Sequence, residues 1–238
     1  MRRRRLIGFA LISFSGMYGA DNVLTEQEKA EGWILLFDGK TLTGWDSDAR
    51  ATPGRGAGTR TKAAPQPDAI AQTGSNPRPC STPAGKAPVP AGASHWEVID
   101  GLLEPCGEPA GYLTSKENYK DFILNVDFRT AEDTNSGVFV HSPDGTLGYE
   151  VQIWKQQPQG YNTGSIVGTA KTDRQYDFIP DKWNHYEIAV QGDHLVIVLN
   201  GTKTLDVHDS KFPDGRIRLQ YQKFQIEFKN IKLKLIKS

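Results

Sequence analysis

Polar side chains that could bind or alter a sugar occur at alternate positions of short, otherwise apolar segments. Asp127 and Arg129 follow this spacing in one segment, and Glu150, Gln152 and Trp154 follow it in another. Carboxylates, amides and a guanidinium supply the donors and acceptors that hydroxyl groups need, and an indole supplies a flat surface for a pyranose ring. The same residues would also suit an ordinary solvated sheet surface, and the spacing alone leaves both interpretations open.

Four more residues in nearby segments could join such a site. They are Asn135, Ser136, His141 and Gln220. An imidazole can act as acid or base near neutral pH, although a single histidine such as His141 is more often a surface or hydrogen-bonded residue. If all these side chains gather on one sheet face, that face would offer a base, a cation and several amides to a carbohydrate.

The segments that carry these residues have the alternation of β-strands. Apolar residues recur at every second position in 122–128, 149–153 and 217–221, so one side of each strand would face a core. In the last segment the apolar positions change from even to odd at Lys229-Asn230, as an extra residue in a β-bulge would cause. Short strands at this density predict an all-β sandwich or jelly roll.

Two turns and one short helix complete the expected elements. Gln191-Gly192-Asp193 and Asn200-Gly201 separate apolar runs as hairpin turns do. Thr25 followed by Glu28 is a capping-box pattern, which predicts a helix of one or two turns over 25–31.

Length and composition favour one exported domain. The 238 residues are 37% hydrophobic, enough for a core. Arg2–Arg5 precede an apolar run to Ala20 that is too short to cross a bilayer comfortably, so we expect 1–20 to be a signal peptide, with an uncleaved anchor as the alternative. Without those four arginines 24 basic residues stand against 28 acidic ones, which argues against a nucleic-acid partner. We expect the mature chain, 21–238, to be periplasmic or secreted, with no stable membrane span.

A long segment inside this domain has a different composition. Residues 51–94 contain eight prolines and ten alanines but few large aliphatic residues, so we expect a flexible, disordered insertion. The two cysteines, Cys80 and Cys106, could form a disulfide in an oxidising compartment, or both could be unpaired thiols.

Many short motifs resemble, in order, those of the 3-keto-disaccharide hydrolase family, formerly a domain of unknown function. They include GWILLFDGKTLTGW at 32–45, WEV at 96–98, NSGVF at 135–139, GYEVQI at 148–153, LNG at 199–201 and FKNIK at 228–232. The resemblance covers nearly the whole mature chain except the insertion. It implies a concanavalin-like jelly roll and action on 3-keto-glycosides in the bacterial envelope.

The chemistry of such a substrate assigns roles to the candidate residues. A ketone at C3 acidifies the C2 hydrogen, so that a base can remove it, the group at C1 can leave by elimination, and water can then add. Glu150 and His141 could be the base and the proton donor, in either order. Arg129, or a divalent metal ion held by Glu150 and its neighbours, could stabilise the enolate. The substrate would be bound by Asp127, Asn135, Ser136, Gln152, Trp154 and Gln220.

Two other classes of function remain open at this point. A non-catalytic carbohydrate-binding module of the same architecture would use Trp154 and the amides to retain a sugar without turning it over. A structural or adhesive envelope protein would act through the basic, proline-rich segment 51–94. Deletion of that segment separates the adhesive protein from the other two.

Overall fold

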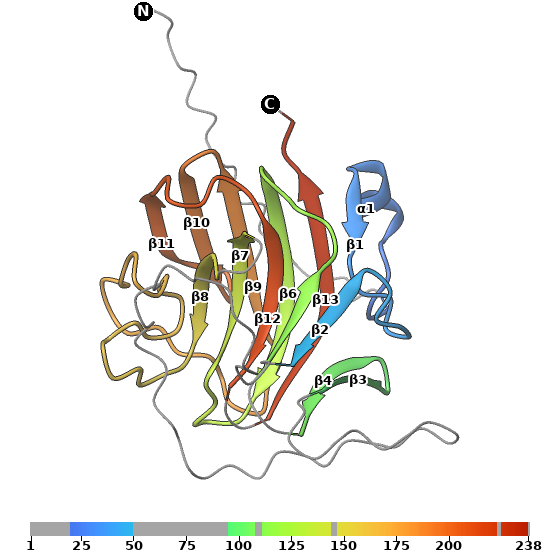
Figure 1. The fold of residues 1–238 in the computed structure, drawn as a ribbon, viewed down its shortest axis with the longest axis horizontal. Coiled ribbons are helices and arrows are strands. Elements are labelled where there is room, and N and C mark those ends of the chain that lie inside the picture. Colours follow the sequence, from blue (N-terminus) through green and yellow to red (C-terminus); the bar gives the residue numbers. More distant parts are fainter. Residues whose placement is uncertain (1–19, 50–94, 108–110, 144–146, 223–224, 238) are drawn as a thin grey trace, which may run out of the picture.

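The protein is an all-β sandwich in which two antiparallel sheets face each other (Figure 1). The computed structural model describes residues 20–49, 95–107, 111–143, 147–222 and 225–237. The expected all-β jelly-roll fold is confirmed. The expected signal peptide, the insertion 51–94 and Cys80 lie outside the described residues, apart from Ala20. Cys106 is buried and disulfide-bonded.

The eight-stranded sheet has the strand order β11-β10-β9-β6-β13-β4-β3, and β1 also pairs with β13. The strands of this sheet are β1 (Trp33–Leu35), β3 (His95–Ile99), β4 (Leu102–Cys106), β6 (Phe122–Thr130), β9 (Asn184–Gln191), β10 (His194–Leu199), β11 (Thr202–His208) and β13 (Ile226–Leu235). The five-stranded sheet has the order β2-β5-β12-β7-β8. Its strands are β2 (Trp45–Ala49), β5 (Gly111–Ser115), β7 (Ser136–Ser142), β8 (Tyr149–Ile153) and β12 (Arg216–Tyr221).

The core lies between the sheets and follows the alternation of the strands. Phe122, Leu124, Val126 and Phe128 of β6 are fully buried there, whereas the residues between them are only half-buried. Side chains point to opposite faces at successive positions of a strand, so each strand has one core face and one outward face.

The turns, bulge and helix expected from the sequence are confirmed. Asn200 and Gly201 both have positive φ angles between β10 and β11, as a tight hairpin turn requires. The pairing of β13 with β6 shifts register after Lys229, and Asn230 has φ +52°. The helix α1 (Glu26–Ala30) begins after Thr25 with a complete capping box. In the described part of the chain no helix is long and apolar enough to cross a bilayer.

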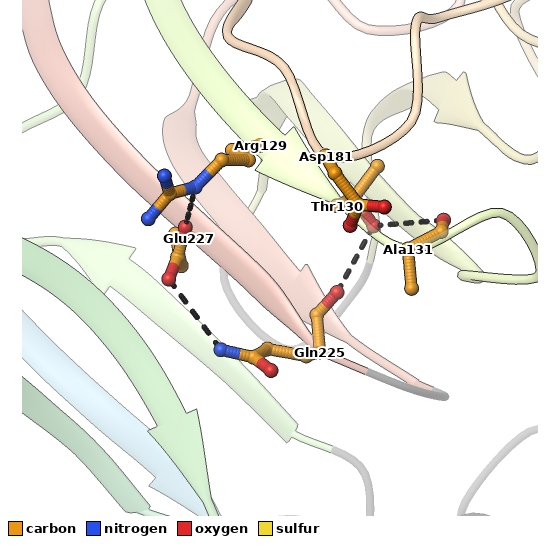
Figure 2. A pocket seen from close by; sticks show the side chains of 6 residues that line it. All are labelled: Arg129, Thr130, Ala131, Asp181, Gln225 and Glu227. Carbon is orange, nitrogen blue, oxygen red and sulfur yellow. Dashed lines mark hydrogen bonds and ion pairs between the residues drawn. The ribbon is translucent and has the colours of Figure 1, made fainter.

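The outward face of the eight-stranded sheet carries ion pairs. Arg129 of β6 is paired with Glu227 of β13, and Gln225 donates to the other carboxylate oxygen of Glu227 at 3.4 Å (Figure 2). These side chains border a cavity of about 220 Å³ at the end of the two strands.

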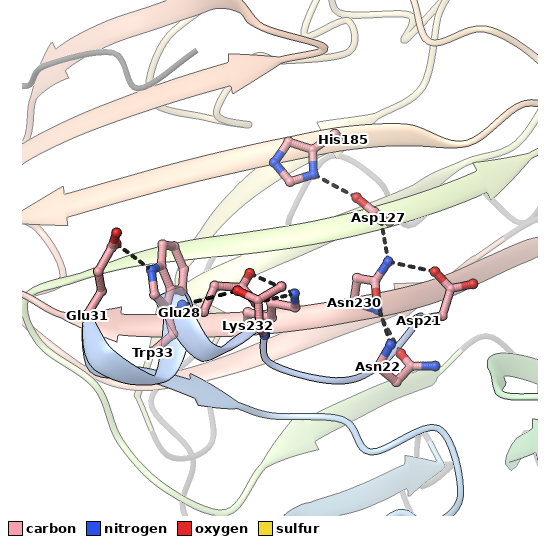
Figure 3. Close-up of polar contacts among 10 residues, drawn as sticks. Asp21, Asn22, Glu28, Glu31, Trp33, Asp127, His185, Asn230 and Lys232 are labelled. Carbon is pink, nitrogen blue, oxygen red and sulfur yellow. Dashed lines mark hydrogen bonds and ion pairs between the residues drawn. The ribbon is translucent and has the colours of Figure 1, made fainter. Parts of the chain in front are cut away.

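The N-terminal segment is held to the same face along β13 (Figure 3). Asn22 and Asn230 each bond through a side-chain oxygen to the backbone N–H of the other, at 2.6 and 2.8 Å. The ion pairs are Lys229 with Asp21 at 2.8 Å, Lys232 with Glu28 at 2.7 Å and Lys234 with Glu31 at 3.1 Å. The first described residues are thereby tied to the last strand.

The Glu28–Lys232 pair should make stability depend on pH. Burial raises the pKa of Glu28, but hydrogen bonds from Lys232 and from Thr25 together outweigh it, and the pKa lies below the ordinary 4.5. The stabilisation is therefore complete above that value and is lost as the pH falls through the folded-state pKa. Glu28→Gln keeps a side chain that can complete the capping box but removes the charge.

We expect urea unfolding to show Glu28→Gln less stable than the wild type at neutral pH, by a difference that shrinks as the pH falls below 4.5 toward and through the folded-state pKa of Glu28. A stability difference between the two proteins that stays constant across this range would contradict the assignment.

Candidate functional site

A cluster of buried polar residues lies on the outward face of the five-stranded sheet. In β8 the apolar residues face the core, so Glu150 and Gln152 point outward, yet they are only 3% and 0% exposed. The same alternation in β12 turns Arg218 and Gln220 outward, and Gln220 is 3% exposed. Buried polar side chains on the side of a sheet that is not its core need a physical explanation, and a binding site, where a few polar groups fix a ligand, is one.

The strand register determines which of these residues are neighbours. Phe139 of β7 lies opposite Glu150 on one side and opposite Arg218 on the other. Gly137 lies opposite Gln152, and one further step of the same β7–β12 register places Gln220 on its other side. The carboxylate and the guanidinium therefore flank one β7 residue, and the two amides flank the next outward one.

Gly137 lies between the two amides and has no side chain, which lets the Glu150 side chain lie close to its backbone. A Cβ atom built on Gly137 would lie 3.1 Å from both Cγ and Oε1 of Glu150, so the Glu150 carboxylate leans over this residue. We use the term glycine notch for Gly137 together with Glu150, Gln152 and Gln220. Rings border it, since Tyr112 and Phe139 pack edge to face with centroids 5.5 Å apart.

Several atoms at this face have unused hydrogen-bonding capacity. Gln152 Oε1 accepts from the Ile153 N–H at 3.0 Å, and Gln220 Nε2 donates to Gln222 Oε1 at 3.3 Å. Gln152 Nε2, Gln220 Oε1 and Arg218 Nε are buried and have no hydrogen-bond partner among the described residues. Leaving a buried polar group unsatisfied costs about 1–3 kcal/mol, and a bound ligand would remove that cost.

Filling the notch tests whether the Glu150 position matters. Gly137 has no positive φ angle, so Gly137→Ala requires no unusual backbone conformation, but the new methyl group would crowd the Glu150 side chain at 3.1 Å and the Val151 carbonyl oxygen at 3.3 Å and must displace them by a few tenths of an ångström. Small misplacements of a reacting group lower the rate of a reaction strongly. For the expected cleavage of a 3-keto-glycoside we therefore expect kcat to fall by about tenfold or more, while the melting temperature changes little. Unchanged turnover would show that the carboxylate position is unimportant.

The structure does not bring all nine predicted residues together. Arg129 and Asp127 lie on the outward face of the other sheet, which corrects the expectation of one shared face. There Arg129 contacts Glu227 and lies 4.9 Å from the centre of the Trp183 ring, and the hydrogen bond to Glu227 raises the Arg129 pKa. Asp127 contacts His185 Nδ1 at 2.6 Å and accepts from Asn230 Nδ2 at 2.8 Å (Figure 3).

His141 lies inside the sandwich. Its φ of +50° and the irregular pairing of β7 with β12 interrupt the alternation, and its ring packs against Phe122 and Tyr149. The ring nitrogens lie 2.8 Å and 2.6 Å from the carbonyl oxygens of Phe212 and Lys120. With both nitrogens engaged and no exposed surface, His141 holds two backbone segments together and does not reach the notch.

The remaining predicted residues lie near the start of β7 and the end of β8. Ser136 is on the core side, where its hydroxyl donates to the Gln220 carbonyl at 2.7 Å. Asn135 is buried at the start of β7, and alternation places it on the outward face, as Trp154 is placed directly after β8. Trp154 is half-buried.

Arg218, Gly137 and the Tyr112–Phe139 ring pair are not among the residues expected from the sequence. The signal for Arg218 was present, because Ile217, Leu219 and Tyr221 were assigned to the core and the residues between them must then point outward with Gln220. No pattern in the sequence indicated Gly137 or the ring pair, since a glycine or an aromatic residue in a strand has many ordinary explanations.

A divalent metal ion finds no suitable ligand set here. Among the described residues no three His, Cys, Asp or Glu side chains lie close enough to hold one. The outward neighbours of Glu150 are an aromatic ring, a glycine and an amide. The described residues of this face therefore do not fit a divalent metal ion.

Comparison with known proteins relates this chain to one family and to several solved structures. A family model described as the 3-keto-alpha-glucoside-1,2-lyase-like domain matches residues 32–234. One Parabacteroides distasonis structure, whose assignment as a glycosyl hydrolase is provisional, superposes with a TM-score of 0.64 at 22% identity, over 92% of this chain and 100% of that one. A second, with the same provisional assignment and organism, has a TM-score of 0.52 at 25% identity, over 59% and 90% of the two chains. Among curated proteins none matches the sequence.

Proposed function

Because this chain belongs to the 3-keto-alpha-glucoside-1,2-lyase-like family, we propose that it cleaves the glycosidic bond of 3-keto-glycosides by elimination across C1 and C2. Family membership relates the protein to carbohydrates. The particular observation that supports cleavage is the buried carboxylate of Glu150 on the same outward face as Arg218, with Phe139 between them.

Glu150 is the base in this proposal. Its carboxylate takes the C2 proton that the neighbouring ketone acidifies, and the electrons of the broken C–H bond form the C2–C3 double bond of an enolate. When the enolate collapses, a C1–C2 double bond forms and the C1–oxygen bond breaks. The departing oxygen receives a proton from the carboxyl group of Glu150, so one side chain balances the elimination. Addition of water to the product completes a net hydrolysis.

Arg218 takes the place that the sequence interpretation assigned to Arg129. A guanidinium near the C3 oxygen stabilises the negative charge that develops there, and in a buried site this effect is large. The Arg218 Nε atom is buried and has no hydrogen-bond partner in the described ranges, so it is available for such a role. Arg129 is occupied by Glu227 on the other sheet.

A comparison of two substrates tests this function. The protein should release free sugar from a 3-keto-disaccharide but not from its unoxidised parent, because only the ketone makes the C2 hydrogen acidic. Deuterium at C2 should slow the reaction if removal of that hydrogen limits the rate. Release from both sugars at equal rates would contradict the elimination, and retention of the keto-sugar without release would favour a carbohydrate-binding module.

A further inference from the structure

We propose that Gln152 and Gln220, on either side of Gly137, recognise a single sugar hydroxyl, the one on C2. The inference rests on the proposed function and deepens it, because it assigns specificity to the same face. It also predicts that two residues which touch neither the leaving group nor the ketone control which keto-sugars are accepted.

The hydrogen-bonding state of the two amides defines the chemistry of the group they bind. Gln152 Oε1 is already engaged by the Ile153 N–H, so this amide offers its Nε2 donor. Gln220 Nε2 is engaged by Gln222, so this amide offers its Oε1 acceptor. One donor and one acceptor suit a hydroxyl, which can accept from the first and donate to the second. A ketone oxygen can only accept and an ammonium group can only donate, so neither satisfies both amides.

The hydroxyl would be bound beside Gly137, between the two amides and next to the Glu150 side chain. Gly137 lies between the strands that carry the two amides, and a side chain there would fill the position next to Glu150. Since the Glu150 carboxylate leans over the same residue, a group bound in the notch would lie close to the proposed base, which takes the proton from C2. The hydroxyl on C2 is bonded to that carbon, which makes it the natural occupant.

The surroundings should make this recognition strong. Gln152 and Gln220 are 0% and 3% exposed, and the Tyr112 and Phe139 rings lie on the same face. A buried amide left unpaired by a substrate that lacks the hydroxyl keeps its full desolvation cost, which is why sites of this type reject such analogues.

The test pairs two variants with two substrates. We expect Gln152→Leu and Gln220→Leu each to lower kcat/KM for a 3-keto-disaccharide by about 10- to 100-fold. For the analogue without the C2 hydroxyl, each variant should differ from the wild type by about twofold or less, because no hydroxyl remains to be lost. Gln191→Leu, at the end of β9 in the other sheet, is the matched control and should leave both substrates unaffected.

Equal losses on both substrates would show that the amides act only on the structure of the face and would overturn the proposal, as would no loss on either. If the wild type turns over neither sugar, the proposed function fails, but the same comparison can be made with dissociation constants from calorimetry. Weaker binding of only the hydroxyl-bearing sugar to both variants would still support the hydroxyl site.

Discussion

Glu150→Gln is expected to lower kcat for a 3-keto-disaccharide by about a thousandfold, the middle of the range for loss of a general base. The amide has nearly the same shape as the carboxylate and can occupy the space over Gly137, but it cannot accept the C2 proton. Initial rates of sugar release, with circular dichroism to confirm the fold, are the measurement.

Glu187→Gln is the matched control. Glu187 points outward from β9 in the opposite sheet, so the same change of charge is made far from the notch. We expect its kcat to equal that of the wild type. A thousandfold loss in the control, or full activity of the Glu150 variant, would remove Glu150 from the role of base.

Arg218→Met should lower kcat/KM by about a hundredfold or more, because it removes the cation that faces the developing enolate charge. Methionine keeps much of the apolar stem of arginine, so packing beside Phe139 should change little. The expected loss lies mainly in kcat, since the enolate charge is present only after the substrate has begun to react.

Arg129→Met distinguishes the two faces of the molecule. Here we expect a lower melting temperature, because the buried Glu227 loses its cationic partner, but a kcat/KM within about twofold of the wild type. The reverse pattern, with Arg129 essential and Arg218 dispensable, would move the site to the cavity beside Arg129 on the eight-stranded sheet (Figure 2).

Much of the fold could be predicted because its main signals are local. The alternation in β6, the turn at Asn200-Gly201 and the capping box at Thr25 each depend on residues a few positions apart, and all three are confirmed. The bulge in β13 could be predicted for the same reason, because the apolar positions of that segment change from even to odd residue numbers.

The candidate site could be predicted only in part. Glu150, Gln152 and Gln220 were correctly expected to point away from the core and to lie near one another, since alternation decides the face of each strand. His141 departs from this because one residue with positive φ reverses the direction of its side chain.

The sequence by itself determined that the chain is a β-sandwich with polar residues on its outward faces, because the direction of a side chain follows from its own strand. Only the tertiary structure decided that β6 joins one sheet while β7, β8 and β12 join the other. Strand order depends on hydrogen bonds between segments far apart in the chain. The spacing of residues within one strand does not predict which other strand it will pair with. That order separates Arg129 from Glu150, places Arg218 beside Phe139, and places Gly137 between two amides.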